Sequence, residues 1–131
     1  MNPQKKTILI LEDETPLLEV IKSKLETEGF RVVTARSVSQ ALEYLKNGIK
    51  INLVWLDHYL LGKESGLDFI TKLKQKGSVW KNLPVFVVSN TVSPEKVQIY
   101  FNLGIKKCYT KVDFRLDQII ADIKKFLETN K

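Results

Sequence analysis

The chain has 131 residues, a length that suits one compact domain, and 44% of them are hydrophobic, which is enough for a real core. Its single cysteine, Cys108, excludes an internal disulfide and favours a reducing compartment. The apolar run near the amino end, Ile8–Leu11, is too short for a secretion signal or a membrane span. We therefore expect a soluble cytoplasmic protein.

The net charge of +6 has two interpretations. A concentrated basic patch would attract nucleic acid, a membrane or an acidic protein surface, whereas scattered lysines only keep a surface solvated. Most lysines fall on the polar faces of predicted helices and are scattered along the chain: Lys22, Lys24, Lys46, Lys50, Lys72, Lys74, Lys76, Lys124 and Lys125. We favour the solvated surface, so neither nucleic acid nor a membrane is an expected partner.

Five short apolar segments predict β-strands. They are Thr7–Glu12, Phe30–Ala35, Ile51–Leu56, Pro84–Val88 and Ile105–Thr110. The first and third are continuous apolar runs, which is typical of strands that are buried on both faces. The fifth contains Lys106 and Lys107, and these charged side chains suit the edge of a sheet better than its centre.

A helix is predicted after each strand, from capping residues and from apolar residues spaced three or four apart. The predicted starts are Thr15-Pro16, Ser37 with Gln40 in the spacing of a capping box, Gly66, Ser93-Pro94 and Asp113. The predicted buried faces are Leu17, Ile21 and Leu25; Val38, Ala41, Leu42 and Leu45; Leu67, Ile70 and Leu73; and Leu116, Ile119, Ile120, Ile123 and Leu127.

Five alternating strand and helix units predict an α/β fold. Right-handed crossovers between parallel strands place helices on both faces of a five-stranded sheet, which makes the fold doubly wound. We expect residues 1–131 to form one domain, with a core of about residues 5–127 and no separate output domain. In such a sheet, ligands bind beyond the carboxyl ends of the strands.

Five polar residues lie at or directly after the ends of the predicted strands. Glu12 and Asp13 lie at the end of the first strand, Asp57 follows the third, Ser89 the fourth and Lys111 the fifth. One loop carboxylate is usually only solvated. All five at the same edge of a parallel sheet indicate a site that contains three carboxylates, a hydroxyl and a lysine.

The charges of these side chains suggest the chemistry. Three crowded carboxylates repel one another and need a cation, and oxygen ligands favour Mg²⁺. Together with Lys111, the ion would balance the carboxylates and leave Asp57 ionised as a nucleophile. A phosphoryl group on Asp57 would seek donors, which Ser89 and Lys111 could supply. Positioning and charge neutralisation are what phosphoryl transfer requires.

Four segments of the chain, ILILEDE, VWLDHYLLGKESGLDFI, VFVVSN and YTK, resemble the bacterial response-regulator receiver domains. The resemblance covers nearly the whole chain and implies a flavodoxin-like sheet in the order 2-1-3-4-5, as in the CheY-like single-domain receivers. It also implies roles for six residues. Glu12 and Asp13 match the metal-binding pair, Asp57 the phosphoacceptor, Ser89 the switch hydroxyl, Lys111 the phosphate-binding lysine, and the backbone carbonyl of Tyr59 a further metal ligand.

The implied function is a signalling switch and not an enzyme that turns over a separate substrate. A sensor histidine kinase or a histidine phosphotransfer protein would donate the phosphoryl group to Asp57 in the presence of Mg²⁺, and an unknown output protein would bind the altered surface. A phosphorylation-dependent homodimer is left open. The alternative is a basic protein-binding module that has a receiver fold but no longer uses phosphorylation. A phosphatase is disfavoured because Tyr59 stands where a second acid is expected.

Several positions depart from the family pattern. Cys108 replaces the switch aromatic residue, with Tyr109 beside it, and Asn90 replaces a small residue after Ser89. Val112 stands where proline is usual after the lysine. Leu61 also replaces a proline, in a loop one residue longer than usual. These changes leave the acceptor chemistry intact and put the usual output mechanism in doubt. For Tyr109 we favour ordinary packing against a helix.

Further predictions concern individual side chains. We expect His58 to face solvent in the loop beside Asp57, Trp55 to lie in the core and Trp80 to pack at the surface. Tyr59 and Asn90 are larger than a site with fast hydrolysis would favour, so we expect a long-lived phosphoryl group. Without proline at position 112, we expect a trans Lys111–Val112 bond and a last helix capped by Asp113.

Overall fold

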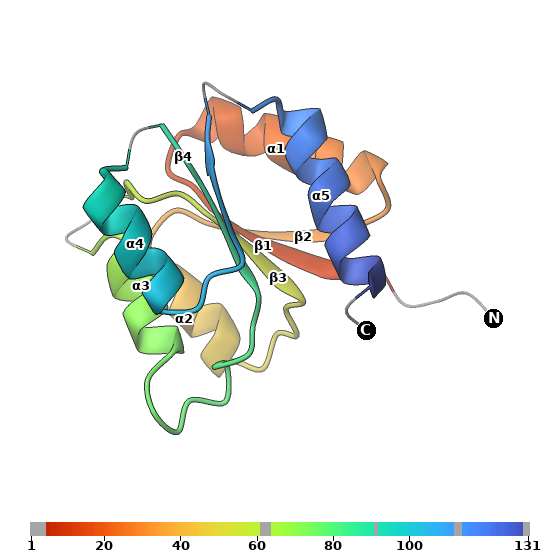
Figure 1. Ribbon diagram of the computed structural model, residues 1–131. Helices are drawn as coiled ribbons and strands as arrows, with labels where there is room; N and C mark the ends of the chain where they lie inside the picture. Colours follow the sequence, from red (N-terminus) through yellow and green to blue (C-terminus); the bar gives the residue numbers. More distant parts are fainter. Residues whose placement is uncertain (1–4, 61–63, 91, 112–113, 130–131) are drawn as a thin grey trace.

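The computed structural model describes residues 5–60, 64–90, 92–111 and 114–129. Five strands form one parallel sheet in the order β2-β1-β3-β4-β5, as predicted (Figure 1). The strands are β1 (Thr7–Leu11), β2 (Arg31–Ala35), β3 (Leu53–Leu56), β4 (Val85–Ser89) and β5 (Lys107–Thr110). Strand β5 lies at an edge of the sheet, as Lys106 and Lys107 predict.

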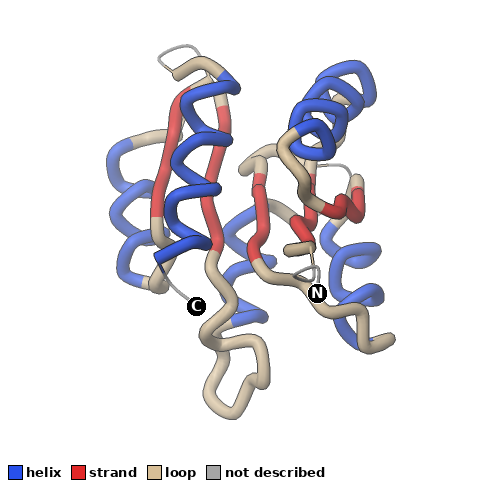
Figure 2. Tube along the Cα trace, turned by 90° about the vertical axis from the view of Figure 1, so that its right-hand side faces the viewer, coloured by secondary structure: helices blue, strands red, loops and turns tan. Residues whose placement is uncertain are grey.

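Five helices cover the two faces of the sheet. They are α1 (Thr15–Thr27), α2 (Val38–Lys46), α3 (Gly66–Leu73), α4 (Pro94–Asn102) and α5 (Leu116–Thr129). Helices α1 and α5 lie side by side on one face, whereas α2, α3 and α4 lie on the other (Figures 1 and 2). The fold is therefore the predicted doubly wound α/β architecture.

Each face of the sheet has its own hydrophobic core. Successive strand side chains point to opposite faces. Ile8 and Ile10 pack under α1 and α5 in the first core, and Leu9 and Leu11 pack under the other three helices in the second core. All four are completely buried. Full burial of an aliphatic side chain stabilises the fold by about 1.5–3 kcal/mol. The continuous apolar runs in the sequence arise from this burial on both faces. Trp55 is part of the first core, as predicted.

Parallel pairing aligns the carboxyl ends of the strands. Leu11 pairs with Leu56 at the ends of β1 and β3, and Leu56 pairs in turn with Val87 of β4. Ser89 pairs with Thr110 at the ends of β4 and β5. The residues that follow these strands therefore meet at one edge of the sheet, where the candidate site lies.

The helix starts differ in detail from the predictions. Helix α1 begins at Thr15 itself, and Glu14 occupies the capping position without a side-chain hydrogen bond. At α2, the Ser37 side chain accepts a hydrogen bond from the Gln40 N–H, but the Gln40 side chain accepts from Arg36 and not from Ser37. Only half of the predicted capping box therefore forms.

The buried faces of two helices are rotated slightly from their predicted positions. In α1, Leu18 is buried and Leu17 only partly so. In α3, Phe69 is fully buried while Leu67 packs at the margin of the core. The spacing of apolar residues does not decide which of several nearby apolar residues is buried most deeply. The orientation of the helix on the sheet decides this. Trp80 is half-buried against the second core, which agrees with surface packing.

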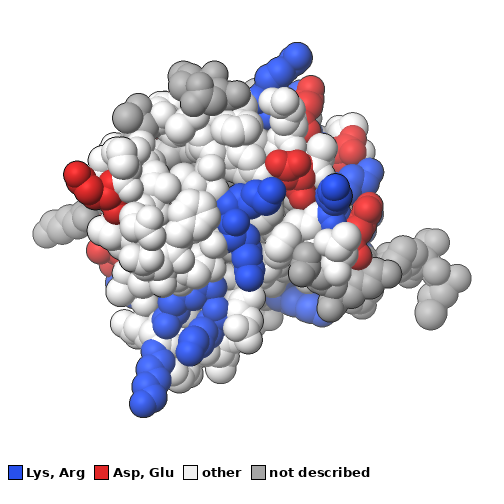
Figure 3. Space-filling view, viewed as in Figure 1, with Lys and Arg blue, Asp and Glu red and all other residues white. Residues whose placement is uncertain are grey.

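The charges on one face of the molecule are dispersed. On the face shown in Figure 3, Lys and Arg side chains stand in several groups separated by uncharged surface, and the carboxylates lie mainly beside them. Ion pairs link Lys24 to Asp117 at 3.0 Å and Lys124 to Glu28 at 3.4 Å, in both cases between α1 or the turn after it and α5. Within the described part of the chain, no helix combines the length and apolar character that crossing a membrane requires.

Helix α1 offers a direct test of the core it covers. Leu25 has no exposed surface, whereas Val20 of the same helix is 46% exposed. We expect Leu25→Ala to lower the free energy of unfolding by about 2–5 kcal/mol and Val20→Ala by less than about 0.5 kcal/mol. Urea unfolding of the two variants measures both values. Equal losses would contradict the packing of this helix.

Candidate functional site

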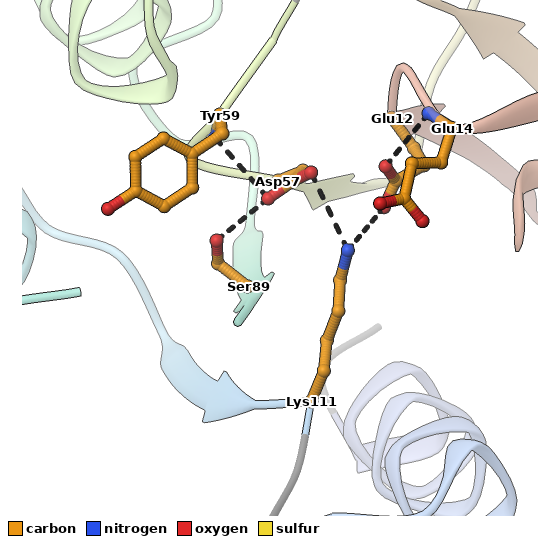
Figure 4. Close-up of polar contacts among 6 residues, drawn as sticks. All are labelled: Glu12, Glu14, Asp57, Tyr59, Ser89 and Lys111. Carbon is orange, nitrogen blue, oxygen red and sulfur yellow. Dashed lines mark hydrogen bonds and ion pairs between the residues drawn. The ribbon is translucent and has the colours of Figure 1, made fainter. Parts of the chain in front are cut away.

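Asp57 is the centre of the candidate site. It follows β3 directly, is 4% exposed, and its N–H donates to the carbonyl of Leu11 at 2.9 Å. Its Oδ1 accepts hydrogen bonds from the Ser89 hydroxyl at 2.7 Å and from the Tyr59 N–H at 3.3 Å. Its Oδ2 lies 3.5 Å from the Lys111 ammonium (Figure 4). The carboxylate thus has polar partners on both oxygens and little contact with bulk water.

Lys111 reaches the site from the end of β5. Its backbone N–H donates to the carbonyl of Ser89 at 2.9 Å, which holds the start of the following loop against β4. Its side chain is 15% exposed, and its ammonium donates to Glu12 Oε1 at 2.8 Å. Burial alone would lower the pKa of Lys111, but the hydrogen bond to Glu12 and the charges of Asp57 and Glu12 raise it instead. The lysine is therefore firmly cationic.

Glu12 is completely buried at the end of β1. Its Oε2 accepts a hydrogen bond from the Glu14 N–H at 3.2 Å. Burial raises the pKa of Glu12 to about 7, and the charge of Asp57 adds to the increase, while Lys111 opposes it. Glu12 therefore changes its charge near neutral pH.

Glu12, Asp13 and Asp57 form an acidic cluster. Each offers a carboxylate oxygen, and these oxygens lie within 4.8 Å of one another. Such a set of hard oxygen donors can hold a divalent cation. Lys111 supplies one positive charge to three carboxylates, so a cation would complete the charge balance. The structure thus gathers at one edge all five residues singled out after the strands; their individual roles stay predictions.

The residues predicted to modulate the site lie around it. Tyr59 is 53% exposed, and its ring extends away from the Asp57 carboxylate and meets the ring of His58 edge-on, with centroids 4.7 Å apart (Figure 4). Asn90 is exposed directly after Ser89. In this arrangement the Tyr59 ring does not cover the carboxylate, and the predicted long phosphoryl lifetime stays a prediction.

Cys108 and Tyr109 face opposite sides of the sheet. The half-buried Cys108 packs toward the α2, α3 and α4 layer. Tyr109 packs against α5, its hydroxyl donates to Asp122 at 2.6 Å, and its ring meets Phe114 edge-on. The expectation that Tyr109 packs against a helix is confirmed. The predictions for the Lys111–Val112 bond and for Asp113 as a cap, and the departure at Leu61, concern positions outside the described residues.

The prediction that His58 faces solvent is wrong. His58 is only 2% exposed, and its Nδ1 lies 2.6 Å from the hydroxyl of Tyr100 in a buried hydrogen bond. Burial lowers the pKa of His58, and the nearby charge of Lys96 adds to this effect, so the ring is neutral at physiological pH. A neutral, buried imidazole is a packing and hydrogen-bonding group at this position.

A signal for this burial was present in the sequence. Val54 and Leu56 of β3 face the second core, and the alternation of a strand continues them to His58. The continuous apolar run of β3 ends at Leu56, so the apolar pattern alone predicts a loop after it. Spacing does not identify Tyr100, because its contact with His58 depends on how α4 packs against the sheet.

The doubly wound sheet and the acidic edge, with its hydroxyl and lysine, define the class of CheY-like signalling domains. The chain belongs to the response regulator receiver domain family, whose sequence model matches residues 8–124. It is therefore a receiver domain of the two-component systems.

Individual relatives agree with this assignment. The chain is 28% identical to the two-component response regulator ORR13 of Oryza sativa subsp. japonica, over 92% of this chain and 93% of that protein. It is 32% identical to the phosphate regulon transcriptional regulatory protein PhoB of Escherichia coli (strain K12), over 89% of this chain but 49% of that protein. It thus spans about half the length of PhoB.

Solved structures show the same fold. A CheY-like response regulator receiver domain protein from Methanospirillum hungatei JF-1 superimposes with a TM-score of 0.85 at 25% sequence identity. The superposition covers 96% of both chains. The similarity therefore includes the complete sheet and both helical layers.

We expect the raised pKa of Glu12 to make cation binding by the acidic cluster depend on pH, because a proton would compete with a divalent ion for this carboxylate. With a pKa of about 7, Glu12 is mostly charged above this value and mostly protonated below it. We expect the affinity for Mg²⁺ to fall about tenfold between about pH 8 and about pH 6. Isothermal titration calorimetry measures the affinity at each pH.

Glu12→Gln is the control for this prediction. It removes the titrating group and keeps the shape of the side chain, so its weaker Mg²⁺ binding should no longer change over the same pH range. An unchanged pH dependence in this variant would assign the proton to another group.

Proposed function

We propose that this receiver domain accepts a phosphoryl group on Asp57, with Mg²⁺ bound beside it, and acts as a conformational signalling switch. The observation that carries the proposal is the placement of the Asp57 carboxylate. It is buried, it lies within reach of the Ser89 hydroxyl and the Lys111 ammonium, and it belongs to the acidic cluster.

The donor set of the acidic cluster fits Mg²⁺, which prefers oxygen ligands and retains several waters. Asp13 and Asp57 would bind the ion directly, and Glu12 mainly through a water molecule. The backbone carbonyl of Tyr59 would supply a further oxygen. When bound, Mg²⁺ would neutralise part of the negative charge that accumulates around the incoming phosphoryl group.

Asp57 would supply the nucleophile for phosphoryl transfer. One of its carboxylate oxygens forms a bond to phosphorus while the bond between phosphorus and the donor atom breaks, and that electron pair leaves with the donor. The Ser89 hydroxyl and the Lys111 ammonium already flank the two oxygens of Asp57. After transfer, both can donate hydrogen bonds to phosphoryl oxygens, which are strong acceptors.

The physiological donor would be a sensor histidine kinase or a histidine phosphotransfer protein in the cytoplasm. The phosphorylated domain would then bind an output protein. The domain would catalyse only its own phosphorylation and slow dephosphorylation. Membership of the receiver family supports these partners. The face shown in Figure 3 has no single basic patch that would support the alternative of a basic binding module.

Asp57→Asn tests the acceptor assignment. The amide keeps the shape of the side chain but is not a nucleophile, so we expect no phosphorylation by acetyl phosphate and Mg²⁺. Intact-mass spectrometry measures the gain of one phosphoryl group. Asp117→Asn, on the exposed surface of α5, is the matched control and should be labelled like the wild type. Full labelling of Asp57→Asn would move the acceptor to another residue.

A further inference from the structure

Tyr100 joins helix α4 to the loop that contains Asp57. It is fully buried on the inner side of α4, and its hydroxyl lies 2.6 Å from Nδ1 of His58, the residue directly after Asp57. The two rings meet edge-on, with centroids 5.6 Å apart. This side-chain contact links a helix that contributes no side chain to the acidic cluster with the residue next to the proposed acceptor.

Gly66 makes this approach possible. A Cβ atom at position 66 would lie 2.5 Å from the Tyr100 hydroxyl and 2.9 Å from the carbonyl oxygen of Asp57. Three segments therefore pack closely together at Gly66. They are the loop after β3, the start of α3 and the inner face of α4. In addition, the Gly66 N–H donates to the carbonyl of His58 at 2.9 Å. His58 is thus held by both its main chain and its side chain.

The contacts that hold His58 matter because both of its neighbours in the chain have proposed roles in the site. On one side of it lies Asp57, the proposed acceptor, and on the other lies Tyr59, whose carbonyl is the proposed metal ligand. The Tyr59 N–H also donates to Asp57 Oδ1, so the three residues form one tight segment. A displacement of His58 would shift both the acceptor and the carbonyl. Phosphoryl transfer is sensitive to such displacements, because reacting groups must be aligned in line.

We propose that Tyr100 is a positioning residue for the phosphorylation of Asp57, and that it acts through its hydrogen bond to His58. The hydroxyl fixes residues 57–59 in the arrangement that the acceptor site needs, and it makes the position of α4 and the geometry of the site depend on each other. This inference rests on the proposed function of Asp57. The competing explanation is that the hydrogen bond merely satisfies two buried polar groups.

Tyr109 provides a matched control that separates the two explanations. It is also a buried tyrosine whose hydroxyl makes a 2.6 Å hydrogen bond, but it lies on the opposite face of the sheet, and its partner is Asp122 of α5. Removal of either hydroxyl should destabilise the fold to a similar degree. Only the hydroxyl of Tyr100 should affect residues 57–59.

The experiment compares Tyr100→Phe and Tyr109→Phe in the full chain. The readouts are the initial rate of labelling by acetyl phosphate with saturating Mg²⁺ and the affinity for Mg²⁺ alone. We expect Tyr100→Phe to reduce the labelling rate about three- to tenfold, the change that loss of one hydrogen bond produces. Tyr109→Phe should label within about twofold of the wild type. Urea unfolding confirms that both variants are folded.

Variants of His58 test the route of the effect. His58→Asn keeps a polar atom near the position of Nδ1 and should retain most of the labelling rate, whereas His58→Leu should label as slowly as Tyr100→Phe. If the two residues act through one bond, the double variant His58→Leu/Tyr100→Phe should be no slower than either single variant. Multiplied effects in the double variant would overturn the proposed route.

Failure of this inference can be told apart from failure of the proposed function. If wild type is labelled on Asp57 but Tyr100→Phe matches Tyr109→Phe in both readouts, the positioning role is wrong and the acceptor assignment stands. If the wild type takes no phosphoryl group from acetyl phosphate, both proposals fall. The inference is supported if Tyr100→Phe labels more slowly than Tyr109→Phe and His58→Asn retains most of the wild-type labelling rate.

Discussion

The site depends on a balance of buried charge. Asp57 and Glu12 are withdrawn from water at the end of a buried sheet, and the ammonium of Lys111 lies within reach of both carboxylates. Burial raises the pKa of Glu12, and the charge of Asp57 adds to the increase, because the single ammonium of Lys111 opposes these effects only in part. A ligand that adds positive charge would stabilise this site, and we expect the site to accept further negative charge only with such a ligand bound.

The parallel sheet explains how a short chain assembles such a site. Strands β1, β3, β4 and β5 place the residues at or just after their carboxyl ends at the same edge, and the pairing register fixes how far along the strand direction each one lies. Ser89 is still part of β4 and is fully buried, whereas Lys111 follows the end of β5 and needs its long side chain to reach Glu12. A short side chain at Ser89 and a long one at Lys111 therefore reach the same carboxylate, that of Asp57.

Much of this arrangement could be predicted from the sequence, because both the fold and the site follow from which residues end each strand. The parallel sheet, its two helical layers and the gathering of Glu12, Asp57 and Lys111 follow from the alternation of strands and helices and from the residue types at strand ends. The strand order follows only from the resemblance to receiver domains. The burial of His58 was not predicted, because the apolar run of β3 ends at Leu56 and the polar residue Asp57 follows it. The contact between His58 and Tyr100 is a tertiary contact that depends on how α4 packs against the sheet, so no local sequence pattern predicts it.

The crossing of three segments at Gly66 also limits how this sequence can change. Any larger residue at position 66 would meet the Tyr100 hydroxyl and the main chain of Asp57, so it would require a smaller residue at position 100 or a shifted α4. A smaller residue at position 100 would in turn leave the imidazole of His58 without its partner. The three positions are therefore expected to vary together or not at all, so receivers that lack this glycine should fill the space beneath α4 with a different set of side chains.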